Sequence, residues 1–295
     1  MLARLFNPLD RLLHRWDKEG KKSFFILWNR GLGDVALGLY GLCYKIRQKI
    51  PEASITFLTR EDLATAFELL EGAQVLVDQD MVRGKPYDIV TYLKKLGKPQ
   101  ETFDVVLETI DTKRWLAWQL GRLTPRLKWN TSWDRLSERF SLGKACLGVH
   151  LSSETSSYYR YEKNWPEEKF RELFDKVLAS QDQDIVLFGM QAGKPFIHPR
   201  IKDLRGQTSF LEMMAIIKNH CSHLLAPDSG VLSIVYYLDE AFPLKVVSLW
   251  ADPRQGILKQ KVASPNRALH HYPLLGHKEA VQNISVEHVF KTLYP

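Results

Sequence analysis

The sequence predicts an α/β protein of two tandem units, each built on a sheet whose strands are mainly parallel. Short apolar segments alternate with segments of helical spacing along most of the chain, and this alternation is typical of parallel sheets covered by helices. The same alternation starts again near residue 146. The length of 295 residues also suits two domains, because one domain usually takes about 100 to 200 residues.

The composition is that of a folded protein with an affinity for anions. Hydrophobic residues make up 45% and charged residues 25% of the chain, which excludes disordered, collagen-like and disulfide-dense proteins. Lysine and arginine number 41 against 34 acidic residues, a net charge of +7. A phosphorylated substrate, a membrane surface and nucleic acid are therefore all candidate partners.

Cysteine spacing and hydropathy indicate the compartment. Cys43, Cys146 and Cys221 are far apart among apolar or small residues and match no metal-ligand spacing, so we expect buried thiols in a reducing cytoplasm. No run approaches the about 18 apolar residues of a membrane span, and charged residues interrupt the place where a signal peptide would be apolar. We therefore expect a cytoplasmic protein that does not span a membrane.

Residues 1–20 form a separate amphipathic segment. Basic residues lie between apolar residues that recur at helical spacing, and Asn7 followed by Pro8 suits a helix start. The apolar residues are Leu2, Leu5, Phe6, Leu9, Leu12, Leu13 and Trp16. Two interpretations are open: a helix that contacts an anionic membrane surface, and an ordinary helix that caps the first domain.

The first unit is expected over residues 21–143. Residues 23–28 are an apolar run typical of a buried strand, and a helix follows Asp34 and ends at Pro51. Further strands are predicted at 54–58, 75–77 and 104–107, and a further helix at 62–70.

The second unit is expected over residues 144–277. Pro166 suits the first position of a helix, and Ser209 with Glu212 has the spacing of a capping box. Strands are predicted at 146–150, 185–188, 223–226 and 245–249, and helices at 166–178, at 209–218 and after Gly230. Residues 278–295 contain a predicted terminal helix at 286–293, which can cross back to the first unit.

The loop Asn29-Arg30-Gly31-Leu32-Gly33-Asp34 follows the first predicted strand and opens a helix. Ligands of α/β proteins bind at such strand ends. Gly31 and Gly33 would let the backbone turn tightly, and Asp34 at the helix N-terminus would stay ionised. Asp34 is therefore either a general base that faces a sugar hydroxyl or a plain helix cap.

Two further groups follow strands of the second unit. Ser152 and Ser153 end one strand, and Lys163 precedes a helix, so the three can converge on a phosphate. Alternatively, Lys163 is one solvated lysine among many. Asp228-Ser229-Gly230 can hold ligand hydroxyls and phosphates, or form an Asx turn that caps the next helix.

Taken in order, these segments resemble glycosyltransferase family 9, the bacterial lipopolysaccharide heptosyltransferases and their relatives. The resemblance covers roughly residues 22–255 and depends on many pieces in the right order. The matching pieces are Gly33-Asp34-Val35, Pro51-Glu52-Ala53-Ser54-Ile55, Lys163-Asn164-Trp165-Pro166-Glu167-Glu168-Lys169-Phe170, Val186-Leu187-Phe188-Gly189, the run Asp203-Leu204-Arg205-Gly206-Gln207-Thr208-Ser209-Phe210-Leu211-Glu212, and Pro227-Asp228-Ser229-Gly230.

The resemblance implies a GT-B fold, in which two Rossmann-like domains face each other across a cleft. It implies that the first domain binds the acceptor and the second the nucleotide-sugar, with inversion at the anomeric carbon and without a metal or other cofactor. The implied donor is ADP-linked, such as ADP-heptose, and the implied acceptor is an anionic lipid-linked glycan of the envelope. The expected location is cytoplasmic, peripheral at the inner membrane.

Residue by residue, the resemblance implies that Asp34 is the catalytic base. The implied donor-phosphate ligands are Ser152, Ser153, Lys163, Ser229 and Gly230, with Asp228 on the donor sugar. The nucleotide would meet Gly189, Gly206, Gln207 and Thr208, and the acceptor would meet Gly33, Lys113 and Arg114.

Three departures from the family pattern favour a second hypothesis. Ser233 stands where the family has a histidine, and residues 190–194 lack the acidic residue that commonly meets the ribose. Residues 250–253 read Trp-Ala-Asp-Pro where Gly-Pro-Thr is common. The alternative is therefore a catalytically degenerate paralogue that still binds a nucleotide or glycan.

Residues 111–144 combine many basic residues with Trp115, Trp118, Trp129 and Trp133. They form either an acceptor-binding face, a nucleic-acid groove or buried tryptophans under a solvated basic surface. We expect no nucleic-acid partner, because no nucleic-acid motif accompanies the segment.

Overall fold

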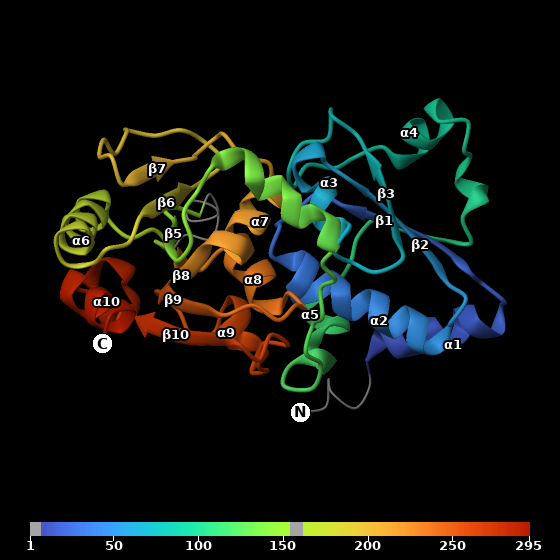
Figure 1. Ribbon diagram of the computed structural model, residues 1–295. Coiled ribbons are helices and arrows are strands. Elements are labelled where there is room, and N and C mark those ends of the chain that lie inside the picture. The colour runs from blue at the N-terminus through green and yellow to red at the C-terminus, as the bar shows by residue number, and fades with distance from the viewer. Residues whose placement is uncertain (1–6, 154–161) are drawn as a thin grey trace. The chain divides into compact units, whose positions relative to one another are not determined.

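The computed structural model describes residues 7–153 and 162–295 (Figure 1). Contacts divide the chain into two units, residues 1–128 with 260–263, and residues 129–259 with 264–295. No helix in these described ranges is long and apolar enough to cross a bilayer. The fold is α/β with two parallel sheets, as predicted.

The first unit contains a four-stranded parallel sheet in the order β3-β2-β1-β4. The chain runs outward from β1 to β3 and then returns to the other side of β1, so the strand order reverses at β1, where α/β proteins bind ligands. Its strands are β1 (Ser23–Trp28), β2 (Ser54–Thr59), β3 (Ala73–Val77) and β4 (Val105–Leu107). Its helices are α1 (Pro8–Lys18), η2 (Val35–Leu39), α2 (Tyr40–Lys49), α3 (Glu61–Phe67), α4 (Ile89–Lys95), η3 (Gln100–Thr102), α5 (Thr112–Trp115) and η4 (Ala117–Gln119).

Helix α1 packs on the first unit through its apolar face. Leu9, Leu13 and Trp16 are buried, and the Trp16 ring meets Phe24 of β1 edge-on at 5.6 Å between centroids. Asn7 caps the helix by accepting a hydrogen bond from the Leu9 amide. The capping-helix interpretation is therefore confirmed for the described part of residues 1–20, and this apolar face is not available to lipid. Residues 1–6 lie outside the described ranges.

The second unit contains a six-stranded parallel sheet in the order β10-β9-β8-β5-β6-β7. The strand order reverses between β5 and β8, which are neighbours. Its strands are β5 (Cys146–His150), β6 (Ile185–Phe188), β7 (Ile201–Asp203), β8 (Cys221–Pro227), β9 (Leu244–Trp250) and β10 (Leu269–Leu275). Its helices are η5 (Thr131–Phe140), α6 (Glu167–Ser180), α7 (Phe210–His220), α8 (Gly230–Tyr237), α9 (Gly256–Gln260), η6 (His277–Glu279), η7 (Val281–Asn283) and α10 (Val286–Leu293), and α9 ends at the boundary with residues 260–263.

Both ends of the second unit differ from the expected boundaries. Residues 129–143 belong to it rather than to the first unit, because η5 packs on α7 through the Asp134–Lys218 ion pair at 2.9 Å and the Arg139–Glu212 pair at 2.7 Å. Helix α10 packs on α6 in the second unit. These contacts place residues 278–295 in the second unit and do not show the predicted crossing to the first unit.

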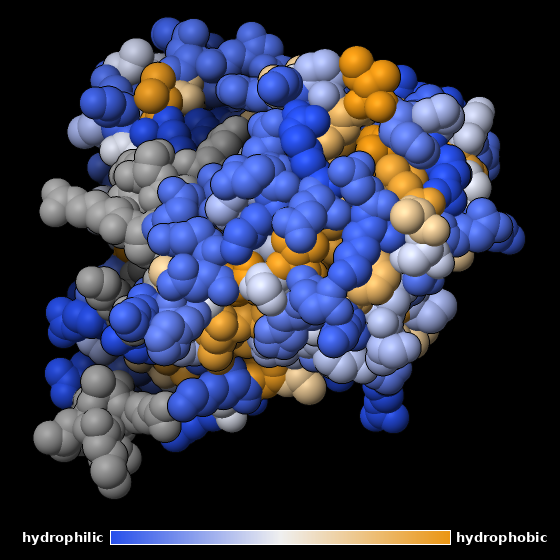
Figure 2. Space-filling model, turned by 90° about the vertical axis from the view of Figure 1, so that its left-hand side faces the viewer, coloured by the Kyte–Doolittle hydropathy of each residue, from blue (hydrophilic) through white to orange (hydrophobic). Residues whose placement is uncertain are grey.

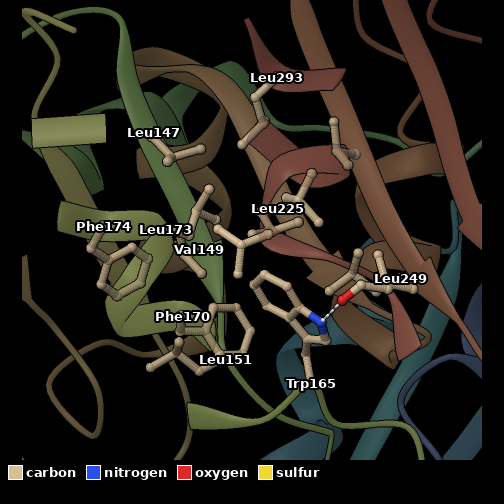
Figure 3. Packing of buried hydrophobic residues seen from close by; sticks show 14 of the residues in the cluster. Leu147, Val149, Leu151, Trp165, Phe170, Leu173, Phe174, Leu225, Leu249 and Leu293 are labelled. Carbon is tan, nitrogen blue, oxygen red and sulfur yellow. Dashed lines mark hydrogen bonds between the residues drawn. The ribbon is translucent and has the colours of Figure 1, made fainter. Parts of the chain in front are cut away.

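A single apolar cluster fixes the segment that leads into α6 (Figure 3). Trp165 packs among residues of β5, β8 and β9, and its indole Nε1 donates to the Ile284 carbonyl oxygen at 3.0 Å. Removing such a buried ring costs about 3–5 kcal/mol. Trp165 thus holds the residues just before it, including Lys163, near the carboxyl ends of the central strands.

The outer surface of the second unit around α6 and α10 is mainly hydrophilic (Figure 2). Apolar residues reach that face only in small areas between polar ones. Both helices are amphipathic, with Phe170, Val177 and Val289 buried and the charged pairs Arg171–Glu167 and Lys176–Glu287 on the outside. The core of this unit is therefore closed by polar helix faces.

The three cysteines are free and buried, as predicted. Burial disfavours the charged thiolate and raises the pKa of the Cys43 thiol to about 12. The thiols therefore behave as small apolar groups.

Candidate functional site

The loop after β1 places Asp34 at the start of the following helix, as predicted. Asp34 is half-buried, and its side chain does not cap the helix. Its Oδ2 instead accepts a hydrogen bond from the Gly31 amide, which precedes it, at 3.2 Å. The interpretation of Asp34 as a plain helix cap is therefore wrong, and its carboxylate is held by the loop itself.

Gly31 is required by space rather than by backbone conformation. The backbone turns tightly here, as predicted, because the Asp34 amide donates to the Gly31 carbonyl oxygen at 3.3 Å. Neither Gly31 nor Gly33 has a positive φ. A Cβ on Gly31 would lie 3.0 Å from Asp34 Oδ2, closer than such contacts normally allow. The missing side chain lets the loop close around the carboxylate.

The helix that follows Asp34 begins with one π turn, η2. The side-chain amides of Gln119 and Gln260 both donate to the Leu37 carbonyl oxygen in this turn, at 2.6 and 3.3 Å. A methyl group on Gly41 would overlap Gln119 Oε1, so glycine admits this close approach. Single π turns are frequent at functional sites, and here two buried glutamines hold one next to Asp34.

The second unit brings Lys163 and Asp228 together where its strand order reverses. Lys163 Nζ donates to Asp228 Oδ2 at 2.7 Å, and the two residues are only 7% and 5% exposed. Lys163 is therefore not a solvated lysine. Burial of charges is costly unless they are paired. This ion pair is therefore part of the buried structure at the strand ends and not a surface contact.

Asn164 fastens the predicted phosphate loop beside this pair. Its Oδ1 accepts from the Ser153 amide at 2.7 Å, and its Nδ2 donates to the Ser153 carbonyl oxygen at 3.3 Å. Ser153 is buried, whereas Ser152 is exposed. Residues 154–161 of the polar insert lie outside the described ranges.

The start of α8 completes the group. Ser229 caps the helix, because its Oγ accepts from the Leu232 amide at 3.2 Å, and Gly230 is the first helical residue. Ser233 Oγ donates back to the Ser229 carbonyl oxygen at 3.1 Å. Gly256 has a φ of +47°, and a Cβ there would lie 2.5 Å from Asp228 Oδ1, so this glycine makes room for the carboxylate.

The residues predicted to meet the nucleotide follow β6 and β7. The Gly206 amide donates to the Gly189 carbonyl oxygen at 2.9 Å, which joins two of them. Gln207 Nε2 donates to the Asp203 carbonyl oxygen at 2.8 Å, and Thr208 leads into the capping box of α7. Arg205 fills the space under residues 189–194, held by Asp203 and by the Lys194 carbonyl oxygen.

The basic tryptophan segment is divided between the two units. Trp115 and Trp118 belong to the first unit and Trp129 and Trp133 to the second, and all four rings are buried or half-buried. Trp118 stacks on Tyr44 at 6.2 Å between centroids. The interpretation as tryptophans packed under a basic surface is therefore confirmed, and the side chains offer no row of exposed rings to nucleic-acid bases.

The structure shows contacts between some of the residues predicted for the site, whereas the proximity of the others stays a prediction. Lys163 with Asp228 and Gly189 with Gly206 are in contact. Asp34 lies in the other unit, and the expectation that it faces the ion pair across a cleft stays a prediction. Arg114 is exposed on α5, and the side chain of Lys113 lies outside the described part of the chain. Among the described residues, no group of three or more His, Cys, Asp or Glu is arranged for a metal ion.

Sequence reasoning missed the supporting residues. Gln119 and Gln260 carry no motif and lie far apart in the chain, so only the fold brings them to Leu37. Asn164 and Gly256 had weak signals: the first stands next to Lys163, and the second follows the Asp252-Pro253 turn.

Comparisons with known proteins agree with this arrangement. The model of glycosyltransferase family 9 (heptosyltransferase) matches residues 83–257, and comparison with curated protein sequences finds no match. The chain is similar to E. coli ADP-heptose LPS heptosyltransferase II, with a TM-score of 0.63, 14% identity, and coverage of 92% of this chain and 97% of that one. It is also similar to a family 9 glycosyl transferase from Veillonella parvula DSM 2008, with a TM-score of 0.56, 15% identity, and coverage of 92% and 95%.

A third similar structure is E. coli heptosyltransferase WaaC with ADP, with a TM-score of 0.51, 14% identity, and coverage of 91% and 96%. At these identities the likeness shows the fold, which is GT-B. The family match extends over more than half of the chain and includes Lys163, Asp228 and the strands that present them. The chain belongs to glycosyltransferase family 9 (heptosyltransferase) and is a glycosyltransferase.

Proposed function

We propose that the protein transfers heptose from an ADP-heptose-like donor to a lipopolysaccharide-type or other envelope glycan. The observation that carries this proposal is the buried Lys163–Asp228 pair at the reversal of strand order in the second unit. Ligands of parallel α/β sheets bind at that place, and the family to which the chain belongs transfers sugars.

The ion pair offers both charges that a nucleotide-sugar needs. The Lys163 ammonium is a point charge for the diphosphate, assisted by the hydroxyls of Ser152 and Ser153 and by the amides of Ser229 and Gly230 at the start of α8. The Asp228 carboxylate accepts hydrogen bonds from sugar hydroxyls. Gly189, Gly206, Gln207 and Thr208 are proposed to contact the nucleotide. Positive charge at the leaving diphosphate stabilises it as the glycosidic bond breaks, so the proposed transfer needs no metal ion.

Asp34 is proposed as the general base. It takes the proton from the acceptor hydroxyl while that oxygen forms a bond to the anomeric carbon, and the bond from that carbon to the diphosphate oxygen breaks with inversion. The loop supports this role, because the Gly31 amide orients Asp34 Oδ2 and the carboxylate is only half-buried. Gly33, Lys113 and Arg114 are proposed to contact an anionic, lipid-linked acceptor at the cytoplasmic membrane surface.

Two observations favour a second candidate function, a degenerate paralogue that binds a nucleotide or glycan without turnover. Ser233 bonds back to its own helix at Ser229, so it does not replace the family histidine as a polar group near the donor. Residues 189–194 also close over Arg205 instead of presenting an acidic side chain.

A donor screen separates the two functions. ADP-, UDP-, GDP- and CMP-sugars are tested for thermal stabilisation, because a ligand of the folded state raises its stability, and for release of the nucleoside diphosphate with a truncated lipid acceptor. We expect one ADP-sugar to stabilise the protein and to turn over. Asp34→Asn should lose about 100- to 10,000-fold in turnover and keep donor binding, whereas Asp80→Asn, an exposed change in the same unit, should keep both.

Each result decides between the hypotheses. Donor binding without turnover in the wild type would favour the degenerate paralogue. Turnover that survives Asp34→Asn would overturn the role of Asp34, and stabilisation by no donor would overturn the proposed function as a whole.

A further inference from the structure

The first unit contains an arginine pocket, and of its lining residues only Arg114 is among those proposed to contact the acceptor. The pocket has a volume of about 500 Å³ and is lined by Pro8, Arg11, Leu12 and Arg15 of α1 and by Arg114 of α5. Three guanidinium groups therefore surround one opening, whose remaining lining is apolar.

Acidic and basic residues of α1 face different neighbouring helices. Asp10 and Asp17 pair with Lys45 and Lys49 of α2, at 3.0 and 2.8 Å. Two acidic residues of the helix are thus paired on the side of α2, whereas its Arg11 and Arg15 line the pocket with Arg114 of α5. An anion in the pocket would meet a positive local field.

Two of these arginines are held only loosely by a neighbouring carboxylate. Arg15 lies 3.9 Å from Glu19, and Arg114 lies 3.8 Å from Asp111. Both distances exceed those of a hydrogen bond, and all four side chains are largely exposed. Their guanidinium forks can therefore turn to a planar, two-oxygen acceptor such as a phosphate.

The walls of the pocket are fixed to each other. Asn7 at the start of α1 is buried, and its Nδ2 donates to the Trp115 carbonyl oxygen of α5 at 2.7 Å. Another face of α1 is anchored by the buried side chains of Leu9 and Leu13. The spacing of the arginine backbones is thus set before any ligand binds, which lowers the entropy cost of binding.

We propose that the arginine pocket binds the phosphate of an anionic lipid headgroup at the membrane surface. The arginines take the phosphate oxygens, and Pro8 and Leu12 contact the first carbons of the lipid. The buried apolar face of α1 rules out insertion by that face, so attachment is electrostatic and weakens with salt. The proposal goes beyond the transfer reaction and does not depend on Asp34 or Lys163.

The test is vesicle flotation of the full chain. Vesicles contain phosphatidylcholine alone or with phosphatidylglycerol. Each basic residue near an anionic surface contributes roughly fivefold in affinity, so Arg11→Gln/Arg15→Gln/Arg114→Gln should bind the anionic vesicles about 100-fold more weakly. The matched control is Lys94→Gln/Lys95→Gln/Lys98→Gln, which removes equal charge from exposed positions at the end of α4 in the same unit and should bind like the wild type.

The outcomes separate this proposal from its rivals. Equal weakening in both triple variants would mean that net charge alone attracts the protein and would overturn the pocket. Arginine-dependent thermal stabilisation by glycerol 3-phosphate, without vesicle binding, would assign the pocket to a soluble phosphate ester and overturn the lipid. Stabilisation by ADP-sugar is measured on the same variants, so a failure of the proposed transfer reaction is seen independently of vesicle binding.

Discussion

The two units present their candidate residues at the same topological position but hold them differently. In the first unit Asp34 follows β1, is half-buried and is held by a backbone amide of its own loop. In the second unit Lys163 and Asp228 are almost fully buried and hold each other at 2.7 Å. A backbone amide thus helps to position the candidate residue of the first unit, whereas charge pairing helps to position the candidate residues of the second unit.

The largest effect on stability is expected when one partner of the ion pair is removed. Lys163→Met removes the ammonium group that pairs with the buried Asp228, and breaking a buried ion pair costs about 3–5 kcal/mol in the free energy of unfolding. Urea unfolding should show this loss, whereas Asp34→Asn should change the free energy by less than about 1 kcal/mol, as is usual for a half-exposed group.

The double variant Lys163→Met/Asp228→Leu is the control, because replacing both charges by apolar groups is often neutral. It should recover most of the lost stability without recovering donor binding. If Lys163→Met alone is as stable as the wild type, the pair is not what positions the donor side.

The units should also differ in their response to acid. Of the nine histidines only His14 lies in the first unit, whereas burial lowers the pKa of His150 and of His271 in the second unit to about 4. The unfolded chain takes up these protons near pH 6.5, but the folded chain does not until pH 4. The contribution of these two histidines to the free energy of unfolding is therefore fully present above pH 6.5 and is lost as the pH falls toward 4.

The size of this loss follows from the shift. A lowering from 6.5 to about 4 corresponds to about 3 kcal/mol for the buried His150, and to less for the partly exposed His271. Urea unfolding at pH 7.5 and pH 5 should show roughly 2 kcal/mol of this loss, because pH 5 lies between the two pKa values. His150→Phe should reduce the loss, because an aromatic ring is kept and the titrating group is removed. An equal loss in His150→Phe and wild type would contradict the assignment to His150.

The core strands could be predicted from the sequence because each is an unbroken apolar run. Residues 23–28, 146–150 and 185–188 were predicted with the bounds that the structure shows. The edge strands β7 and β10 were missed, because β7 has only three residues and β10 contains Pro273 among half-exposed positions. Proline and irregular burial are typical of edge strands, which carry less apolar pattern.

The candidate site was predictable where residues belong to one strand end and not where the fold supplies a partner. Lys163 was named because it precedes a helix and Asp228 because it follows a strand, but their direct contact needed the neighbouring positions of β5 and β8. The π turn after Asp34 was not predicted, because the residues that contact it, Gln119 and Gln260, are far from it in the chain.

Close packing at this π turn gives a third test. Gly41→Ala would push a methyl group into Gln119 Oε1, and overpacking of this kind costs about 1–3 kcal/mol. If backbone geometry positions Asp34, turnover should fall in Gly41→Ala while donor binding in the other unit stays unchanged. The control is Gly41→Ala/Gln119→Ala, which gives the methyl group room, so its loss of stability should be smaller than the sum of the two single losses. Additive losses would show that the two residues do not interact.

The smallest expected effect separates a structural role from a binding role at one residue. Ser229 caps α8 and is also proposed to meet the donor phosphate, whereas Ser209 caps α7 and is not. Each serine-to-alanine change should lower the free energy of unfolding by about 1 kcal/mol, because each removes an N-cap hydrogen bond. Calorimetric titration with ADP should show weaker binding only for Ser229→Ala. If both variants bind ADP equally well, Ser229 acts only as a helix cap, and the donor phosphate is held by Lys163 and the serines after β5.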